Sequence, residues 1–297
     1  MEKIKLLFLG TGNAIPTEKR NHTAILLTYK NENILIDCGE GTQRQFKIAK
    51  ESPNKLTKIL LTHWHGDHIL GLPGLFQTLA MSNYTKTLKI VGPSNTHKHL
   101  TTLSNIINIQ IPLEIKETDA EKIEEKEFII ESLPMSHGTP CNAYSFILKE
   151  KIRIDKKKLK KLKIPNSPLI AQLAQGKDIT FNGKKIKASS LTYQEPQKKI
   201  SFILDTGLNA NLEKIAKEAD ILICEATFSK EETTQAKEYH HLTAEQAAQL
   251  AKKAKVKKLI LTHISQRYEH FPEKLLKEAK KIFKNTHLVK DFDTLEL

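Results

Sequence analysis

The chain has few cysteines and no long apolar run, and each scarcity excludes a class of protein. Its three cysteines, Cys38, Cys141 and Cys224, lie far apart and form no CxxC pair. The sequence therefore predicts neither a disulfide framework nor a cysteine-based zinc site, and reduced thiols fit a cytoplasmic protein. No run reaches the length of about 18 apolar residues that a membrane-spanning helix needs. The apolar start, Ile4–Leu9, is too short for a signal peptide and runs into Gly-Thr-Gly.

Acidic residues are too few to balance the basic ones. Against 47 Lys and Arg stand 34 Asp and Glu, a net charge of +13. A lysine-rich proteome gives such an excess, and so does a protein that binds a polyanion, nucleic acid first. Part of the excess is concentrated in residues 151–163, KIRIDKKKLKKLK, inserted between apolar runs. A charge run is often a solvated helix face, but this insertion into an already basic chain favours a protruding basic arm.

Short apolar runs recur along the chain and predict buried strands. They are KIKLLFLGTG, NILIDCGEG, KILLTHWHGDH, KLKIVGP, EFIIESLPMSHG, NAYSFILKE, KISFILDTG, DILICEATF and KLILTHIS. Helical patterns alternate with the later runs, which predicts parallel strands in an α/β layer arrangement. The closer spacing of the early runs predicts meanders and hairpins. The strings KILLTH (58–63) and KLILTH (258–263) are nearly identical, either by coincidence or because two similar halves each aim a histidine at one site.

The segment HWHGDH, residues 63–68, places three histidines and an aspartate within six positions. His63 and His65 are two residues apart, so in extended backbone they point to the same side. Gly66 permits a bend, and Asp67 and His68 follow where a helix can start. The segment therefore offers a histidine pair and an Asp-His pair, which are ligands that suit zinc and that manganese also accepts.

These four donors can serve one metal ion, whereas two neighbouring ions need donors from elsewhere in the chain. His137, Asp205 and His263 each stand at the end of an apolar run. A carboxylate can bridge two ions that are about 3.5–4 Å apart. The three residues are therefore the candidates for the remaining donors.

HWHGDH matches H-x-H-x-D-H, the signature of the metallo-β-lactamase superfamily, whose members hydrolyse lactams, thioesters and phosphodiesters. The strings IDCGEGTQRQ, PTEKRN, CEATF and HLTAEQAA are similar to the short form of the ribonuclease Z family, and the resemblance covers most of the chain. In IPNSP, Ser167 stands where the family has glycine. The resemblance implies one four-layer αββα domain over residues 1–297, from which a basic arm protrudes at residues 150–176.

The resemblance also implies the metal ligands. One zinc ion is expected on His63, His65 and His137, and a second on Asp67, His68 and His263, with Asp205 bridging the two ions of each subunit. Asp37, in IDCGEG, resembles a carboxylate that orients a ligand histidine.

The activity that the resemblance implies is removal of the 3′ trailer from precursor tRNA, leaving a 3′-OH on the tRNA and a 5′-phosphate on the trailer. Zinc would lower the pKa of a bound water. Asp67 is expected to orient this water, and His241, held by Glu225, is expected to protonate the leaving oxygen. RNA contacts are expected from Arg20 and Asn21 in PTEKRN. Further RNA contacts are expected on the arm from Lys156, Lys157, Lys158, Lys160 and Lys161. A homodimer is expected from the resemblance alone.

Two alternatives keep part of this interpretation. A glyoxalase II-like thioesterase would share HWHGDH but would not need the basic segment, PTEKRN or the HLT string. A non-catalytic RNA-binding relative would show broken ligands, whereas all seven matched ligand positions are intact.

Overall fold

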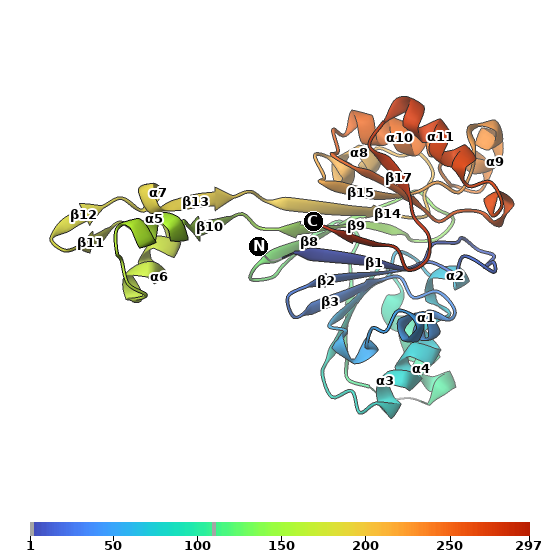
Figure 1. Ribbon diagram of the computed structural model, residues 1–297. Coiled ribbons are helices and arrows are strands. Elements are labelled where there is room, and N and C mark those ends of the chain that lie inside the picture. The colour runs from blue at the N-terminus through green and yellow to red at the C-terminus, as the bar shows by residue number, and fades with distance from the viewer. Residues whose placement is uncertain (1–2, 109–110) are drawn as a thin grey trace.

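Two seven-stranded sheets stack face to face at the centre of the structure, a computed structural model that describes residues 3–108 and 111–297 (Figure 1). In spatial order, the first sheet contains β18 (Thr294–Glu296), β1 (Ile4–Gly10), β2 (Ala24–Tyr29), β3 (Glu32–Ile36), β4 (Lys58–Leu60), β5 (Leu88–Gly92) and β6 (Leu113–Glu117). The second contains β17 (Thr286–Leu288), β16 (Leu259–Thr262), β15 (Ile221–Glu225), β14 (Lys198–Ile203), β9 (Asn142–Leu148), β8 (Phe128–Pro134) and β7 (Glu121–Glu124).

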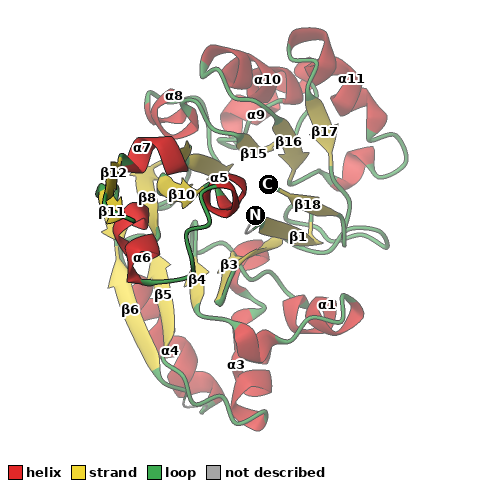
Figure 2. Ribbon diagram, turned by 60° about the vertical axis from the view of Figure 1, so that its left-hand side comes forward, coloured by secondary structure: helices red, strands yellow, loops and turns green. Residues whose placement is uncertain are grey.

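Helices cover the outer face of each sheet (Figure 2). The helices on the first sheet are α1 (Thr42–Ile48), α3 (Leu72–Met81) and α4 (Thr96–Ile107), and those on the second are α8 (Asn211–Ala216), α10 (Ala244–Lys253) and α11 (Glu273–Ile282). The central strands are therefore buried on both faces. In β1, Ile4, Leu6 and Phe8 pack between the sheets, whereas Leu7 and Leu9 pack under the helices. The predicted four-layer α/β fold is confirmed.

The sequence predicts hairpins in the early part of the chain and parallel strands in the later part, and the strand directions agree with this only in part. β14, β15, β16 and β17 run parallel, as the alternation of strands and helices predicts. The first half contains the expected hairpins of β1, β2 and β3, but β3 to β6 also run parallel. β4 and β16, which carry the strings KILLTH and KLILTH, lie in different sheets and are each followed by a histidine. Every helix among the described residues is too short or too polar to span a bilayer.

The loop between β1 and β2 is anchored by Arg20, which is only 4% exposed. Its guanidinium donates hydrogen bonds to Thr11 Oγ1 at 2.6 Å and to the carbonyl oxygen of Val289 at 2.8 Å. The side-chain amide of the neighbouring Asn21 donates to the carbonyl oxygen of Glu40 at 2.7 Å. The prediction that Arg20 contacts RNA does not fit this burial, because a guanidinium enclosed by protein cannot reach a phosphate. Both residues hold the loop in place.

Asp291 completes the anchor from the C-terminal side of the chain. Its carboxylate accepts hydrogen bonds from the Thr11 hydroxyl at 2.7 Å, the Asn21 backbone N–H at 2.7 Å and the Gln45 amide at 3.0 Å. Burial raises the pKa of Asp291 to about 6, although these donors and Arg20 favour the ionised form. The position of the loop therefore depends on a carboxylate that folding makes harder to ionise.

A long arm leaves the second sheet and carries its own small core (Figure 1). Its stalk is the antiparallel pair β10 (Lys151–Ile154) and β13 (Thr192–Glu195), and its head contains α5 (Lys156–Lys161), α6 (Pro168–Ala174), β11 (Ile179–Phe181), β12 (Lys184–Ile186) and α7 (Ala188–Leu191). The buried residues of the head are Leu159, Ile164, Leu173, Ile179, Ala188 and Leu191. The arm therefore extends beyond residue 176, up to Glu195. Ser167 precedes α6 with φ −150° and ψ 169°, an extended backbone that needs no glycine.

The separate core of the arm leads to a prediction about local unfolding. Leu173 is fully buried in the head, so L173A should lower the stability of the arm by about 2–5 kcal/mol. Hydrogen exchange should accelerate in the arm and stay unchanged in the strands of the two large sheets. L162A, at a position that is 47% exposed in the same arm, is the matched control and should change little. Equal acceleration in the arm and in the sheets would contradict an independent core.

The anchor at Asp291 leads to a prediction about pH. Its folded-state pKa of about 6 lies above the ordinary aspartate value, so the folded state binds more protons than the unfolded state between about pH 4 and pH 6. This contribution to stability is present below pH 4 and is lost as the pH rises through 6. From pH 4 to pH 7, D291N should therefore gain about 2 kcal/mol relative to the unsubstituted protein.

The measurement is equilibrium unfolding by denaturant at several pH values, with chelator present so that metal does not contribute. The exposed Asp119 provides the control D119N, which should follow the unsubstituted protein. Parallel curves for D291N and the unsubstituted protein would show that the pKa of Asp291 is not raised.

Candidate metal centre and active site

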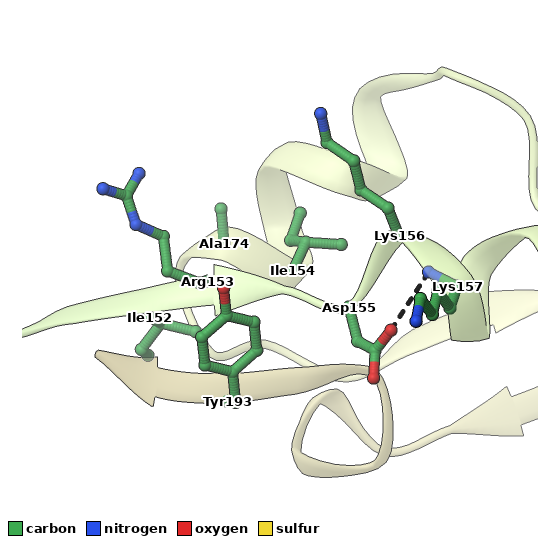
Figure 3. A pocket seen from close by; sticks show the side chains of 8 residues that line it. All are labelled: Ile152, Arg153, Ile154, Asp155, Lys156, Lys157, Ala174 and Tyr193. Carbon is green, nitrogen blue, oxygen red and sulfur yellow. Dashed lines mark hydrogen bonds between the residues drawn. The ribbon is translucent and has the colours of Figure 1, made fainter. Parts of the chain in front are cut away.

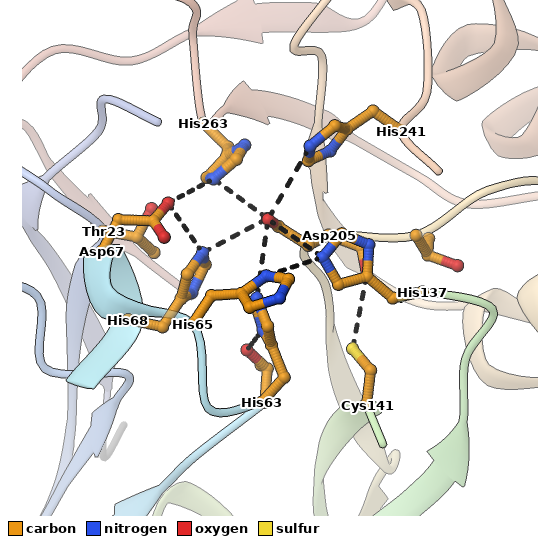
Figure 4. A network of polar contacts seen from close by, with 12 residues as sticks. Thr23, His63, His65, Asp67, His68, His137, Cys141, Asp205, His241 and His263 are labelled. Carbon is orange, nitrogen blue, oxygen red and sulfur yellow. Dashed lines mark hydrogen bonds and ion pairs between the residues drawn. The ribbon is translucent and has the colours of Figure 1, made fainter. Parts of the chain in front are cut away.

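The predicted metal ligands come together where strands of both sheets end (Figure 4). His63 and His65 follow β4, and Asp67 and His68 lie in the short helix α2 (Gly66–Ile69). The other three donors follow strands of the second sheet: His137 after β8, Asp205 after β14 and His263 after β16. The bend at Gly66 separates the two pairs of HWHGDH as its spacing predicts. The seven donors therefore reach one place from four segments of the chain.

The first group of donors is His63, His65 and His137, whose ligand atoms lie within 4.8 Å of one another. Nε2 of His137 is 3.1 Å from Nδ1 of His65. The Nδ1 atom of His137 faces the carbonyl oxygen of His240 at 3.2 Å, so an N–H at this position donates to it. The Nε2 atom of His137 is then left as a lone-pair donor toward the centre of the group.

The second group contains Asp67, His68, Asp205 and His263, again within 4.8 Å. Asp67 Oδ2 is 3.3 Å from His68 Nε2 and 3.5 Å from His263 Nε2. Asp205 lies between the two groups: Oδ1 is 2.9 Å from His263 Nε2, and Oδ2 is 3.7 Å from His63 Nε2. One carboxylate therefore faces both groups of histidines.

The buried atoms of these donors lack hydrogen-bond partners among the described residues. The atoms concerned are His63 Nε2, His68 Nε2, His263 Nε2 and Asp205 Oδ1. His263 Nε2 and Asp205 Oδ1 lie 2.9 Å apart, and the two groups attract each other electrostatically. Buried polar atoms without partners are costly, and these converge on shared points instead of on one another. Imidazole nitrogens and carboxylate oxygens in this arrangement fit divalent cations of the zinc type.

Asp37 orients two histidines that follow β4, His63 and His68, from the side away from the centre of the donor groups. It is fully buried, accepts hydrogen bonds from the Thr62 backbone N–H and hydroxyl at 2.7 Å each, and contacts His68 Nδ1 at 2.6 Å. The Thr62 hydroxyl also contacts His63 Nδ1 at 3.0 Å. Asp37 thus directs His68 Nε2 toward the centre, in the way expected of a carboxylate behind a ligand histidine.

Glu225 does the same for the second sheet and also holds His241. Its buried carboxylate accepts from the Thr206 backbone N–H at 2.7 Å and the Thr227 hydroxyl at 2.6 Å, and it lies 3.0 Å from His241 Nδ1. The Thr227 hydroxyl in turn contacts His263 Nδ1 at 2.9 Å. Burial lowers the pKa of His241, but the carboxylates of Glu225 and Asp205 outweigh burial and raise it above the ordinary value.

Backbone strain occurs at two of these positions. Asp37 has φ 57° and His263 has φ 58°, in the left-handed region that residues with side chains rarely adopt. Asp37 directly follows β3 and His263 directly follows β16. The pairing of these strands with their neighbours in the sheets holds the two residues in this backbone conformation. Such strain clusters at functional sites.

A cavity of about 490 Å³ opens over the donors. Its lining also includes Asn13, Ile15, Phe228, Tyr239, Gln266 and Arg267, none of which is a predicted ligand. The sequence motifs assign no role to these residues, nor to Thr62 and Thr227. Both threonines stand in strings quoted above: Thr62 directly precedes His63 in LTH, and Thr227 comes two residues after Glu225 in CEATF. The five arm lysines are exposed on α5, away from this cavity.

Comparisons with known proteins agree with this geometry. The beta-lactamase superfamily domain matches residues 32–264. Ribonuclease Z of Enterococcus faecalis is 37% identical over 99% of this chain and 97% of its own length. Ribonuclease Z of Nanoarchaeum equitans is 38% identical over 89% of this chain and 84% of its own length. The crystal structure of human tRNase Z, short form, superimposes with a TM-score of 0.71 at 25% identity, covering 98% of each chain.

The match to the superfamily domain extends from β3 to the residues just after β16, so it includes the strands that carry all seven donors. The relatives align along nearly the whole chain, the arm included. The chain belongs to the ribonuclease Z family of metal-dependent endoribonucleases, within the beta-lactamase superfamily.

Proposed function

We propose that this protein removes the 3′ trailer from precursor tRNA by zinc-dependent hydrolysis, leaving a 3′-OH on the tRNA and a 5′-phosphate on the trailer. The observation that carries the proposal is that seven donors form two adjoining groups and five of them line one cavity, in a chain of this family. The same proposal includes a homodimer that works in the cytoplasm, for which the family resemblance is the support.

The metal sites of this proposal follow the two groups of donors. His63, His65 and His137 would hold one zinc ion, Asp67, His68 and His263 a second, and Asp205 would serve both. Bound zinc supplies a Lewis acid and lowers the pKa of water to near neutral, and manganese accepts the same ligands.

Two side chains of the cavity have roles besides coordination. Asp67 lines the cavity, and its Oδ2 lies 3.3 Å from His68 Nε2 and 3.5 Å from His263 Nε2. As a carboxylate it accepts a hydrogen bond from the attacking water and orients it toward phosphorus. His241 keeps its Nε2 toward the cavity while Glu225 binds Nδ1. Its Nε2–H donates the proton to the leaving 3′ oxygen.

The experiment that tests the function is cleavage of a 3′-extended precursor tRNA by the purified protein. We expect one cut, directly after the discriminator nucleotide, which chelator abolishes and added zinc restores. H241A keeps all seven donors, so it should retain two equivalents of zinc and cleave at least about 100-fold more slowly, the usual effect of a general acid.

The controls separate the metal site from the substrate. Zinc content is measured on every preparation before cleavage is compared. An uncut precursor, with two zinc ions bound, would move the activity to another ester, and thioesters would be tested next. Cleavage by H241A at the unsubstituted rate would assign the proton to another donor.

The arm gives a rationale for the basic composition. The helix α5 consists of exposed lysines around the buried Leu159, and its first turn is capped by Asp155, which accepts from the backbone N–H of Lys157 and Lys158. Beside it lies a groove of about 860 Å³ that Arg153, Lys156 and Tyr193 line together with five other residues (Figure 3). These basic side chains would contact the phosphates of the RNA. Phosphate contacts position an RNA without reading its sequence.

Replacing all five lysines of α5 by glutamine should therefore raise KM for precursor tRNA by at least about tenfold, because each phosphate contact releases counterions. The slope of binding against salt should become less steep. Cleavage of a small phosphodiester, bis(4-nitrophenyl) phosphate, should be unchanged.

The control is a variant with five exposed lysines replaced on the outer helices or just beyond them: Lys252, Lys277, Lys280, Lys281 and Lys284. It loses the same formal charge and should keep the KM of the unsubstituted protein. An equal rise of KM in both variants would mean that total charge, and not the arm, attracts the RNA.

A further inference from the structure

One wall of the active-site cavity is aromatic and has no part in the chemistry assigned above. Phe228 and Tyr239 both line the cavity beside His241. Tyr239 is 55% exposed, whereas Phe228 is 6% exposed. The two rings are nearly parallel, at an interplanar angle of 15° with centroids 6.4 Å apart. A single exposed aromatic residue is ordinary on a protein surface, but this one is stacked on a buried ring inside a catalytic cavity.

The local backbone fixes both rings relative to the site. Phe228 is held by backbone hydrogen bonds, to the carbonyl oxygen of Leu242 at 3.3 Å and from the N–H of Ala244 at 3.0 Å. Tyr239 directly follows the helix α9 (Thr233–Glu238) as its C-cap residue. The next residue, His240, turns the chain with φ 55°. The N–H of His241 then donates to the carbonyl oxygen of Ala236 at 2.7 Å. One tight turn therefore sets the distance between Tyr239 and His241.

Arg267 adds a cation to the same wall. Its guanidinium lies 5.4 Å from the centre of the Phe228 ring, and it pairs with Glu232 at 2.9 Å. Arg267 also lines the cavity. A flat aromatic face beside a guanidinium is what proteins offer to the unpaired bases of single-stranded nucleic acid, since every base has a face that can stack.

The Tyr239 hydroxyl makes no hydrogen bond within the described part of the chain. The ring therefore is not held by its polar end, and its contribution is the aromatic face. A phenylalanine at this position should serve equally well.

We propose that Tyr239 is the stacking platform for the base of the nucleotide whose 3′ oxygen leaves in the reaction, with Phe228 and Arg267 fixing the platform. The inference rests on the proposed function, because it places this nucleotide next to His241, the donor of the proton to that oxygen. It assigns the last retained nucleotide, and not the trailer, to the aromatic wall.

The test compares two precursor tRNAs in single-turnover cleavage, one unmodified and one with an abasic ribose at the last retained nucleotide. On the unmodified substrate, Y239A should lower kcat/KM about tenfold, the usual effect of losing one base stack. Y239F should be unaffected, and Y239L, which keeps bulk without an aromatic face, should behave like Y239A.

The abasic substrate separates stacking from a merely structural role. The unsubstituted protein should cleave it about tenfold more slowly, at the rate of Y239A, and Y239A should lose nothing further. F271A removes another exposed aromatic side chain, 44% exposed, and should have no effect on either substrate. Zinc content confirms that each variant keeps its site.

Three results would overturn the inference. An unchanged rate for Y239A on the unmodified substrate would show that no base stacks there. A tenfold loss that persists on the abasic substrate would make Tyr239 structural. If the unsubstituted, zinc-loaded protein leaves the unmodified precursor uncut, the proposed function fails and the inference fails with it. This result differs from the other two, because both of them require that the unsubstituted protein cleaves the precursor.

Discussion

The structure depends on a carboxylate that is buried among histidines. Asp205 is 3% exposed, and five histidines place a ring nitrogen within 4.0 Å of its oxygens: His63, His68, His137, His241 and His263. A buried ion costs several kcal/mol unless it is paired, and several of the surrounding nitrogens have no hydrogen-bond partner in the described structure. Cations at the two donor groups would satisfy the carboxylate and the histidines together. Because these residues come from both sheets, the metal site and the packing of the sandwich are coupled.

In both sheets a buried carboxylate orients the histidines in a similar way. In each sheet a carboxylate at the end of a parallel strand contacts a histidine of another segment: Asp37, which follows β3, contacts His68, and Glu225, which ends β15, contacts His241. Each carboxylate holds a histidine directly and a threonine hydroxyl that contacts another histidine. The two arrangements differ in one respect that matters for chemistry. Asp37 holds His68, which belongs to a donor group, whereas Glu225 holds His241, which belongs to neither of the two donor groups described above.

The extent to which the sequence predicts the site follows from the range of the interactions involved. HWHGDH is a local pattern, so its spacing correctly predicts an extended pair, a bend and a helix start. The two LTH strings look alike, yet the Thr62 hydroxyl binds Asp37 while that of Thr262 has no partner in the described chain, and Thr227 acts instead. That difference depends on which strand lies beside each threonine. Arg20 could not be recognised as buried, because its partner Val289 lies 269 residues away. The end of the arm was likewise hidden, since β13 is defined only by pairing with β10.

The arm shows why a costly local structure can persist. Five lysines in the six-residue helix α5 repel one another, and the opposing local contributions are the Asp155 cap and the burial of Leu159 in the core of the head. A helix of lower charge would be more stable alone, so its stability does not explain the composition. A polyanion that binds this face removes the repulsion, and the ordering of the helix before binding reduces the entropy lost on contact. The separate core of the head holds α5 in place at the end of the arm, away from the two large sheets.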